Sequence, residues 1–132
     1  MSSAFESFKV ESPLGYTVSC SKENWSHIER HEIMKENRDA VIDAVGDPVA
    51  VYSSEEWPDK RDIYFGRSSK ATYGESLYTK VVVNKPTEYI SDGEVVSAWP
   101  QKDISGNIKE GGLLYVKSRP GQKKRYTVHQ DE

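Results

Sequence analysis

The sequence predicts one α+β domain, in which two N-terminal helices pack on a four- to five-stranded antiparallel sheet. Two features of the chain predict this fold. Apolar residues recur at helical spacing between residues 24 and 45, whereas after Pro48 they form short runs rich in valine and isoleucine. With 132 residues, 36% of them hydrophobic, the chain is long enough for a single modest core.

Residues 1–21 are expected to form an N-terminal lead-in, with one short strand over residues 16–20. A first helix is predicted from Asn24 to Met34, and a second from Lys35 to Val45, where alanine and valine follow helical spacing. Gly46 and the Asp-Pro pair after it are typical of a helix end. The order predicted so far is therefore helix, helix, turn.

The first predicted helix carries two of the three histidines of the chain, His27 and His31. Residues four apart lie on the same face of a helix, so the two imidazoles would project together. Trp25 and Ile28 would form a neighbouring apolar face that packs on the sheet. Because imidazole titrates near neutral pH, such a pair is suited to proton transfer.

Five strands are predicted after the helices, because each run is apolar or β-branched and ends at a turn signal. Their ranges are 49–52, 63–65, 77–83, 93–99 and 113–116. Three consecutive valines in the third of these runs predict a strand that is buried on both faces. The domain is expected to span residues 22–118 and to be followed by a basic C-terminal tail, residues 119–132.

The composition favours a cytoplasmic protein and excludes a membrane protein. No apolar run approaches the roughly 20 residues that span a bilayer, and the first residues lack the basic start and apolar stretch of a signal peptide. A single cysteine, Cys20, excludes an intramolecular disulfide and is interpreted as a small, semi-apolar core residue.

The charge of the chain is unevenly distributed. The net charge is −3, but the segment from residue 117 to residue 125 contains five basic residues and no acidic one, leaving 13 basic against 21 acidic residues elsewhere. Such a segment is either a solvated tail or a contact to phosphate. The candidate phosphate contacts in it are Lys117, Arg119, Lys123, Lys124 and Arg125.

Two further residues in predicted strands are candidates for chemistry. Lys80 lies in a strongly apolar strand, on the same face as Tyr78 and Val82, and either reaches solvent from an edge strand or lies in an anion pocket. Ser97 is expected on the same face as Val95 and Trp99. Its hydroxyl either bonds across the sheet or, beside the tryptophan, holds a phosphate and its base.

The two histidines could instead bind a metal ion, because their four-residue spacing suits zinc. The residues between them are not those of a metalloprotease, and three or four grouped ligands are not present in the sequence. We therefore expect no metal and no cofactor.

Four motifs, taken in order, resemble a known family. They are Trp25-Ser-His-Ile-Glu-Arg-His31, the helix end Val45-Gly-Asp-Pro-Val49, the basic strand Tyr78-Thr-Lys-Val-Val-Val83 and the segment Val95-Val-Ser-Ala-Trp-Pro100. Together they resemble the phage-associated branch of the barnase–EndoU–colicin–RelE (BECR) nuclease superfamily. The resemblance covers roughly residues 22–118 and implies two helices followed by a four-stranded antiparallel sheet, in agreement with the pattern above.

The resemblance implies metal-independent RNA cleavage, in which the ribose 2′-hydroxyl attacks the neighbouring phosphate. His31 would then be the acid or base, with His27 as the alternative. Arg30 and Lys80 would stabilise the charge of the transition state, and Ser97 would orient the phosphate or donate a proton. Trp99 would contact the substrate, in a position where the family has tyrosine or phenylalanine.

Two functions are therefore open at the level of sequence. The first is a small endoribonuclease of phage or toxin type, with RNA as substrate and an inhibitory or immunity protein as partner. The alternative is a catalytically silent BECR-like binding module that interacts with protein or nucleic acid in a phage or host-takeover system. Convergence of His31, Lys80 and Ser97 in one cleft is the geometry that would favour the enzyme.

Overall fold

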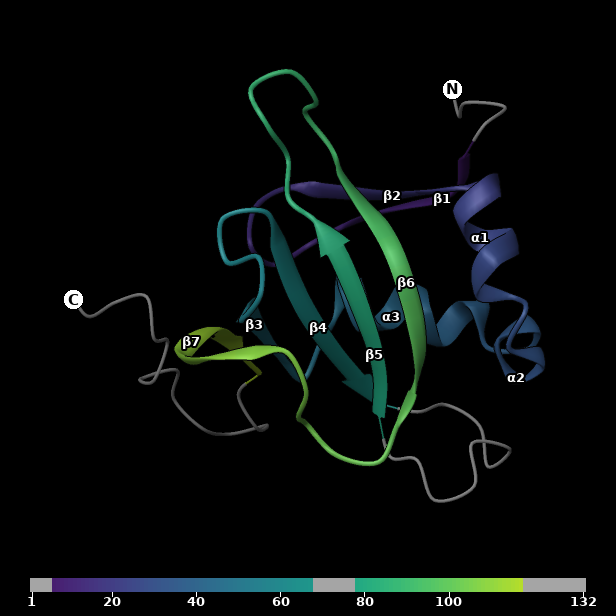
Figure 1. Ribbon diagram of the computed structural model, residues 1–132. Helices are drawn as coiled ribbons and strands as arrows, with labels where there is room; N and C mark the ends of the chain where they lie inside the picture. Colours follow the sequence, from purple (N-terminus) through teal and green to yellow (C-terminus); the bar gives the residue numbers. More distant parts are fainter. Residues whose placement is uncertain (1–5, 68–77, 118–132) are drawn as a thin grey trace.

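The computed structural model describes residues 6–67 and 78–117, which form seven strands and three short helices (Figure 1). The helices are α1 (Lys22–Ile28), α2 (Glu32–Lys35) and α3 (Arg38–Gly46). The strands are β1 (Glu6–Glu11), β2 (Thr17–Ser21), β3 (Ala50–Ser54), β4 (Arg61–Arg67), β5 (Tyr78–Asn84), β6 (Gly93–Gln101) and β7 (Ile108–Val116).

All seven strands belong to one sheet, in the order β1-β2-β6-β5-β4-β3-β7. Each pair of neighbours is antiparallel except β2 and β6, which run parallel and pair only through Val18 with Gly93 and Ser19 with Glu94. The predicted fold class is therefore wrong. The structure is mainly a seven-stranded mixed sheet with a few short helices, in place of two helices on a four- to five-stranded antiparallel sheet.

The N-terminal residues account for the two additional strands. Residues 6–21, expected as a lead-in with one short strand over residues 16–20, form the hairpin β1–β2, which supplies one edge of the sheet. Along β1 only Phe8 and Val10 are apolar, and both are buried at least in part. The tip of the hairpin reaches β4, where Ser12 bonds Tyr64 (2.6 Å between the oxygens) and Tyr16 bonds Asp62.

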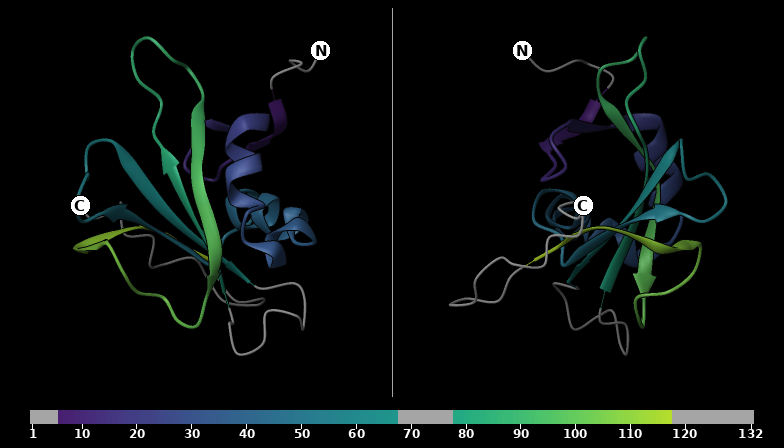
Figure 2. Two further views of the ribbon diagram at one scale, coloured as in Figure 1. Left: turned by 45° about the vertical axis from the view of Figure 1, so that its right-hand side comes forward. Right: turned by 90° about the vertical axis from the view of Figure 1, so that its left-hand side faces the viewer.

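The helices lie together on one face of the sheet (Figure 2), where α1 packs on β6 and α3 packs on β4 and β5. The residues expected to face the sheet do so: Trp25, Ile28, Val41 and Val45 are all buried in one apolar cluster with β-strand residues. The apolar spacing in the sequence therefore identified the inner faces of α1 and α3.

The helix predicted from residue 24 to residue 34 is interrupted, which is a second correction. After Ile28 the amides of Arg30 and His31 bond to carbonyls only three residues back, and His31 is extended (φ −82°, ψ 105°). In a continuous helix Met34 would lie opposite Trp25, because nine residues at 100° each give half a turn beyond two full turns. The break turns the chain so that both side chains are buried.

The helix-free face of the sheet has its own small apolar cluster. Ile63, Phe65 and Val82 are buried there, and Tyr52 and Trp99 pack against them. Neither face carries a described helix long and apolar enough to cross a bilayer.

Candidate functional site

The predicted catalytic residues do not converge. His27 is exposed on α1, and His31 is exposed at the start of α2, so both belong to the layer that covers one face of the sheet. Lys80 and Ser97 lie on the helix-free face, where Lys80 pairs with Trp99 and Ser97 pairs with Val82 across β5 and β6. The break between α1 and α2 also removes the shared helical face that the histidine pair would need.

Lys80 is held inside the protein. It lies on β5, the central strand of the sheet, and is only 4% exposed. Its Nζ donates hydrogen bonds to the backbone oxygens of Ser105 (3.0 Å) and Gly106 (2.6 Å). The ammonium also lies over the rings of Phe65 and Trp99, at 5.7 and 5.3 Å from their centroids. Lys80 therefore anchors the β6–β7 loop, and burial lowers its pKa.

Ser97 and Trp99 share a face, as expected, but Val95 faces the helices. The pairing of β5 with β6 shifts by one residue, because Val82 pairs with Ser97 whereas Val83 pairs with Val95. This β-bulge makes the side chains of residues 95 and 97 point to opposite faces of the sheet. The indole of Trp99 packs beside Lys80 and donates to Gln101 (3.1 Å from Nε1 to Oε1). One face of the Trp99 ring is therefore covered by the side chain of Lys80.

The remaining predicted phosphate contacts are dispersed. Arg30 is exposed in the turn between α1 and α2. Lys117 forms an ion pair with Asp47 (2.8 Å) at the end of β7. The other basic residues of the predicted tail, Arg119, Lys123, Lys124 and Arg125, lie outside the described residues.

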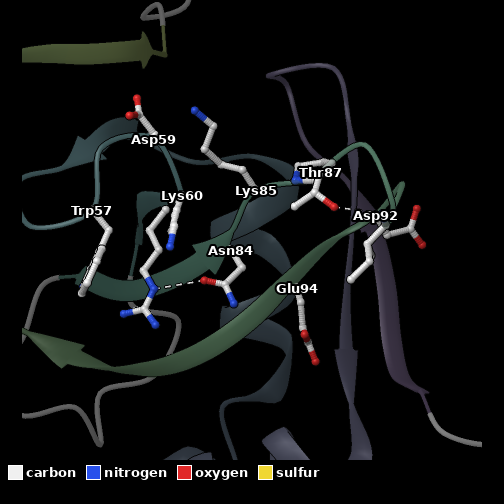
Figure 3. A pocket seen from close by; sticks show the side chains of 11 residues that line it. Trp57, Asp59, Lys60, Asn84, Lys85, Thr87, Asp92 and Glu94 are labelled. Carbon is white, nitrogen blue, oxygen red and sulfur yellow. Dashed lines mark hydrogen bonds between the residues drawn. The ribbon is translucent and has the colours of Figure 1, made fainter.

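A cleft lies at one end of the sheet, between the β3–β4 loop (residues 55–60) and the β5–β6 loop (residues 85–92). Its volume is about 400 Å³, which is within the usual range for ligand sites. Figure 3 shows Trp57 and Lys60 on one side, Thr87 and Asp92 on the other and Asn84 between them. We call it the loop-end cleft.

The strand register brings the two loops together. Arg61 at the start of β4 pairs with Asn84 at the end of β5, and Asn84 pairs with Glu94 at the start of β6. The guanidinium of Arg61 then donates from Nε to the Asn84 side chain (3.0 Å), which forms part of the cleft floor.

Backbone hydrogen bonds hold both loops in place. In the β3–β4 loop, the amide of Trp57 donates to Ser54 Oγ, and the Trp57 carbonyl accepts from the amides of Lys60 and Arg61. In the β5–β6 loop, the Thr87 hydroxyl accepts from the amides of Tyr89 and Ile90. A binding surface built on such loops loses little conformational freedom when a ligand binds.

The charges that line the loop-end cleft are unequally satisfied. On the acidic side, Asp92 pairs with Lys9 (3.3 Å), and Glu94 accepts from Asn24 (3.1 Å). On the basic side, Lys60, Arg61 and Lys85 form no ion pair with any residue that the structure describes, and neither does the third carboxylate of the lining, Asp59. Lys60 instead lies over the Trp57 ring, 5.4 Å from its centroid.

A chain of buried, hydrogen-bonded polar side chains lies on the helix-covered face of β4. Tyr64 donates to Tyr16 (3.0 Å), and Tyr16 donates to Asp62 Oδ2 (2.6 Å). Asp62 is 1% exposed, and its second oxygen is buried with no hydrogen-bond partner among the described residues. Burial is the main cause of the raised pKa of Asp62, which the bond from Tyr16 and the charge of Lys85 only partly oppose.

We expect the Asp62 carboxyl to make folding less favourable as the pH rises. A carboxyl with a raised pKa in the folded state favours folding fully below its unfolded pKa, near 3.9, and this contribution is lost as the pH rises through the folded pKa. Urea unfolding from pH 4 to 8 measures the effect, with Asp62→Asn as the non-titrating control. The wild type should lose stability relative to this variant as the pH rises. A pH-independent difference would contradict the raised pKa.

Sequence reasoning missed the loop-end cleft. In the sequence, Trp57-Pro-Asp is part of a polar segment between two predicted strands, and Tyr89 and Ile90 belong to no predicted element. A tryptophan and a Tyr-Ile pair inside otherwise polar loops were the available signal, because large apolar residues in loops are seldom explained by the core.

Among the described residues, no three side chains of histidine, cysteine, aspartate or glutamate are grouped as metal ligands would be. Comparisons with known protein families, curated proteins and solved structures find no match to this chain. The resemblance to the BECR superfamily therefore stays a prediction that rests on the sequence motifs.

Proposed function

We propose that this protein is a catalytically silent binding module and that its ligand occupies the loop-end cleft. One observation carries the proposal: His31 lies in the helical layer, whereas Lys80 and Ser97 lie on the helix-free face of the sheet. A general acid and base must both come within hydrogen-bond reach of one phosphate. Residues on opposite faces of a sheet do not meet this requirement.

The burial of the Lys80 ammonium supports the same proposal. A lysine that stabilises the transition state of RNA cleavage needs an ammonium that faces the phosphate. Here the ammonium is buried and donates to two backbone carbonyls, so a phosphate would first have to displace the β6–β7 loop.

The loop-end cleft offers what a binding site needs. It is concave, its loops are held by hydrogen bonds, and it combines an exposed tryptophan with cations that have no ion-pair partner in the described chain. We further propose a cytoplasmic location, where the buried thiol of Cys20 would remain reduced.

An RNA cleavage assay tests the proposal. Purified wild type, His27→Ala and His31→Ala should all leave single-stranded and structured RNA intact, because no acid–base pair is assembled. The readout is gel electrophoresis with analysis of RNA ends. Cleavage that leaves a 2′,3′-cyclic phosphate and falls roughly 10²-fold or more in His31→Ala would overturn the proposal.

A further inference from the structure

The large exposed apolar residues of the described chain gather at the loop-end cleft. Trp57 is 43% exposed, Ile90 is 63% exposed and Tyr89 is 88% exposed, and they lie on the two loops that form the cleft. Trp57 and Ile90 also line it, whereas Tyr89 does not. Clustered apolar residues on a monomer surface mark interaction sites, and tryptophan is among the residues that contribute most to binding energy.

The cations that line the cleft indicate the charge of the ligand. Lys60 lies over the Trp57 indole, and Arg61 donates to Asn84 on the cleft floor. Neither has an ion-pair partner in the described chain, whereas two carboxylates of the opposite wall, Asp92 and Glu94, are already bound. A ligand with carboxylates would satisfy both cations without displacing an existing ion pair. Charge complementarity of this kind selects partners and speeds association.

We propose that the loop-end cleft binds an acidic segment of a partner protein. An apolar side chain of that segment contacts Trp57 and Ile90, and its neighbouring carboxylates meet Lys60 and Arg61. The inference rests on the proposed binding function and adds the chemistry of the partner.

Two features favour a peptide over a nucleic acid. Successive bases of a nucleic acid stack on several aromatic rings, but among the described lining residues only Trp57 is aromatic, Lys60 covers one of its faces, and Ile90 offers no ring. The chain also carries a net charge of −3, which repels a polyanion along its whole length. A partner with only a local acidic segment experiences less of this repulsion.

Selection from a library of short random peptides tests the inference. The full chain is immobilised and the library is selected with and without excess polyuridylate as competitor. We expect enrichment of peptides that place aspartate or glutamate beside a large apolar residue, in both conditions. Binding of the enriched peptide is then measured by fluorescence anisotropy at low and high salt, and should weaken as salt rises.

Substitutions then assign the contacts. Trp57→Ala should weaken binding about tenfold or more, as expected for an anchor residue. Lys60→Glu should also weaken it about tenfold or more through like-charge repulsion, and a peptide with lysine in place of glutamate should recover binding to this variant. The control is Lys22→Glu, a charge reversal at an exposed lysine of α1, which should bind like the wild type.

Three results would overturn the inference: no peptide enrichment, enriched peptides without carboxylates, or equal binding by Trp57→Ala and wild type. Polyuridylate that binds the wild type and loses affinity for Trp57→Ala would assign the cleft to nucleic acid, and the binding function would stand. His31-dependent RNA cleavage, in contrast, would reject the binding function itself. The two proposals therefore fail in different experiments.

Discussion

The Lys80→Ala variant is expected to be less stable than the wild type by about 2–3 kcal/mol. The substitution removes three methylene groups and the ammonium from a side chain that is 4% exposed between Phe65 and Trp99, and each buried methylene contributes about 0.8 kcal/mol. Urea unfolding followed by tryptophan fluorescence measures this loss.

Lys80→Met separates the packing of the lysine from its charge. Methionine keeps most of the apolar stem, so this variant should recover most of the lost stability, because burial of the ammonium is itself costly, as its lowered pKa indicates. Both variants should speed amide hydrogen exchange around Ser105 and Gly106, which lose their hydrogen bonds to Nζ. If Lys80→Ala were as stable as the wild type, Lys80 would not anchor the β6–β7 loop, and its ammonium could contact a ligand.

Gly66→Ala is expected to destabilise the fold by about 3 kcal/mol. A Cβ atom at residue 66 would lie 2.4 Å from the α-carbon of Ala44 and 2.5 Å from its β-carbon, so α3 could not keep its distance from β4. Overpacking of this kind usually costs about 1–3 kcal/mol, and the clash with backbone here places the cost at the upper end of that range. Thermal and urea unfolding both measure it.

A double-mutant cycle with Ala44→Gly tests the cause of that loss. Removing the β-carbon of Ala44 relieves one of the two clashes but leaves the clash with its α-carbon, so the double variant should recover only part of the stability lost in Gly66→Ala. Ala44→Gly alone should cost about 1 kcal/mol, as glycine does in a helix. Strict additivity of the two substitutions would show that α3 and β4 do not pack closely at this point.

Local patterns in the sequence identified much of the secondary structure. The strands from β3 to β7 were each predicted near their observed positions, because runs such as Val81-Val-Val83 have strong β-propensity. The inner faces of α1 and α3 were also correct. The strand predicted over residues 16–20 corresponds to β2, but β1 was missed because only Phe8 and Val10 mark its apolar side. The parallel pairing of β2 with β6 leaves no local signal in the sequence.

The geometry of the candidate site could not be predicted from the sequence, although large apolar residues in its loops were a signal of its position. Spacing along the chain suggested that His27 and His31 share a helical face, but burial of Met34 required the helix to break between Ile28 and Glu32. Alternation along β5 placed Lys80 on the correct face, yet it could not show that the β6–β7 loop would supply its hydrogen-bond acceptors. The loop-end cleft depends on the pairing of Arg61 with Asn84, a tertiary contact.

The most direct test of the binding account is an NMR titration of the isotopically labelled protein with an acidic peptide selected on it. We expect the largest amide shift changes within residues 57–61 and 84–94, the segments that contain the lining of the loop-end cleft, and little change at His27 or His31 in the helical layer. The largest changes at the two histidines, with the cleft unaffected, would contradict the account.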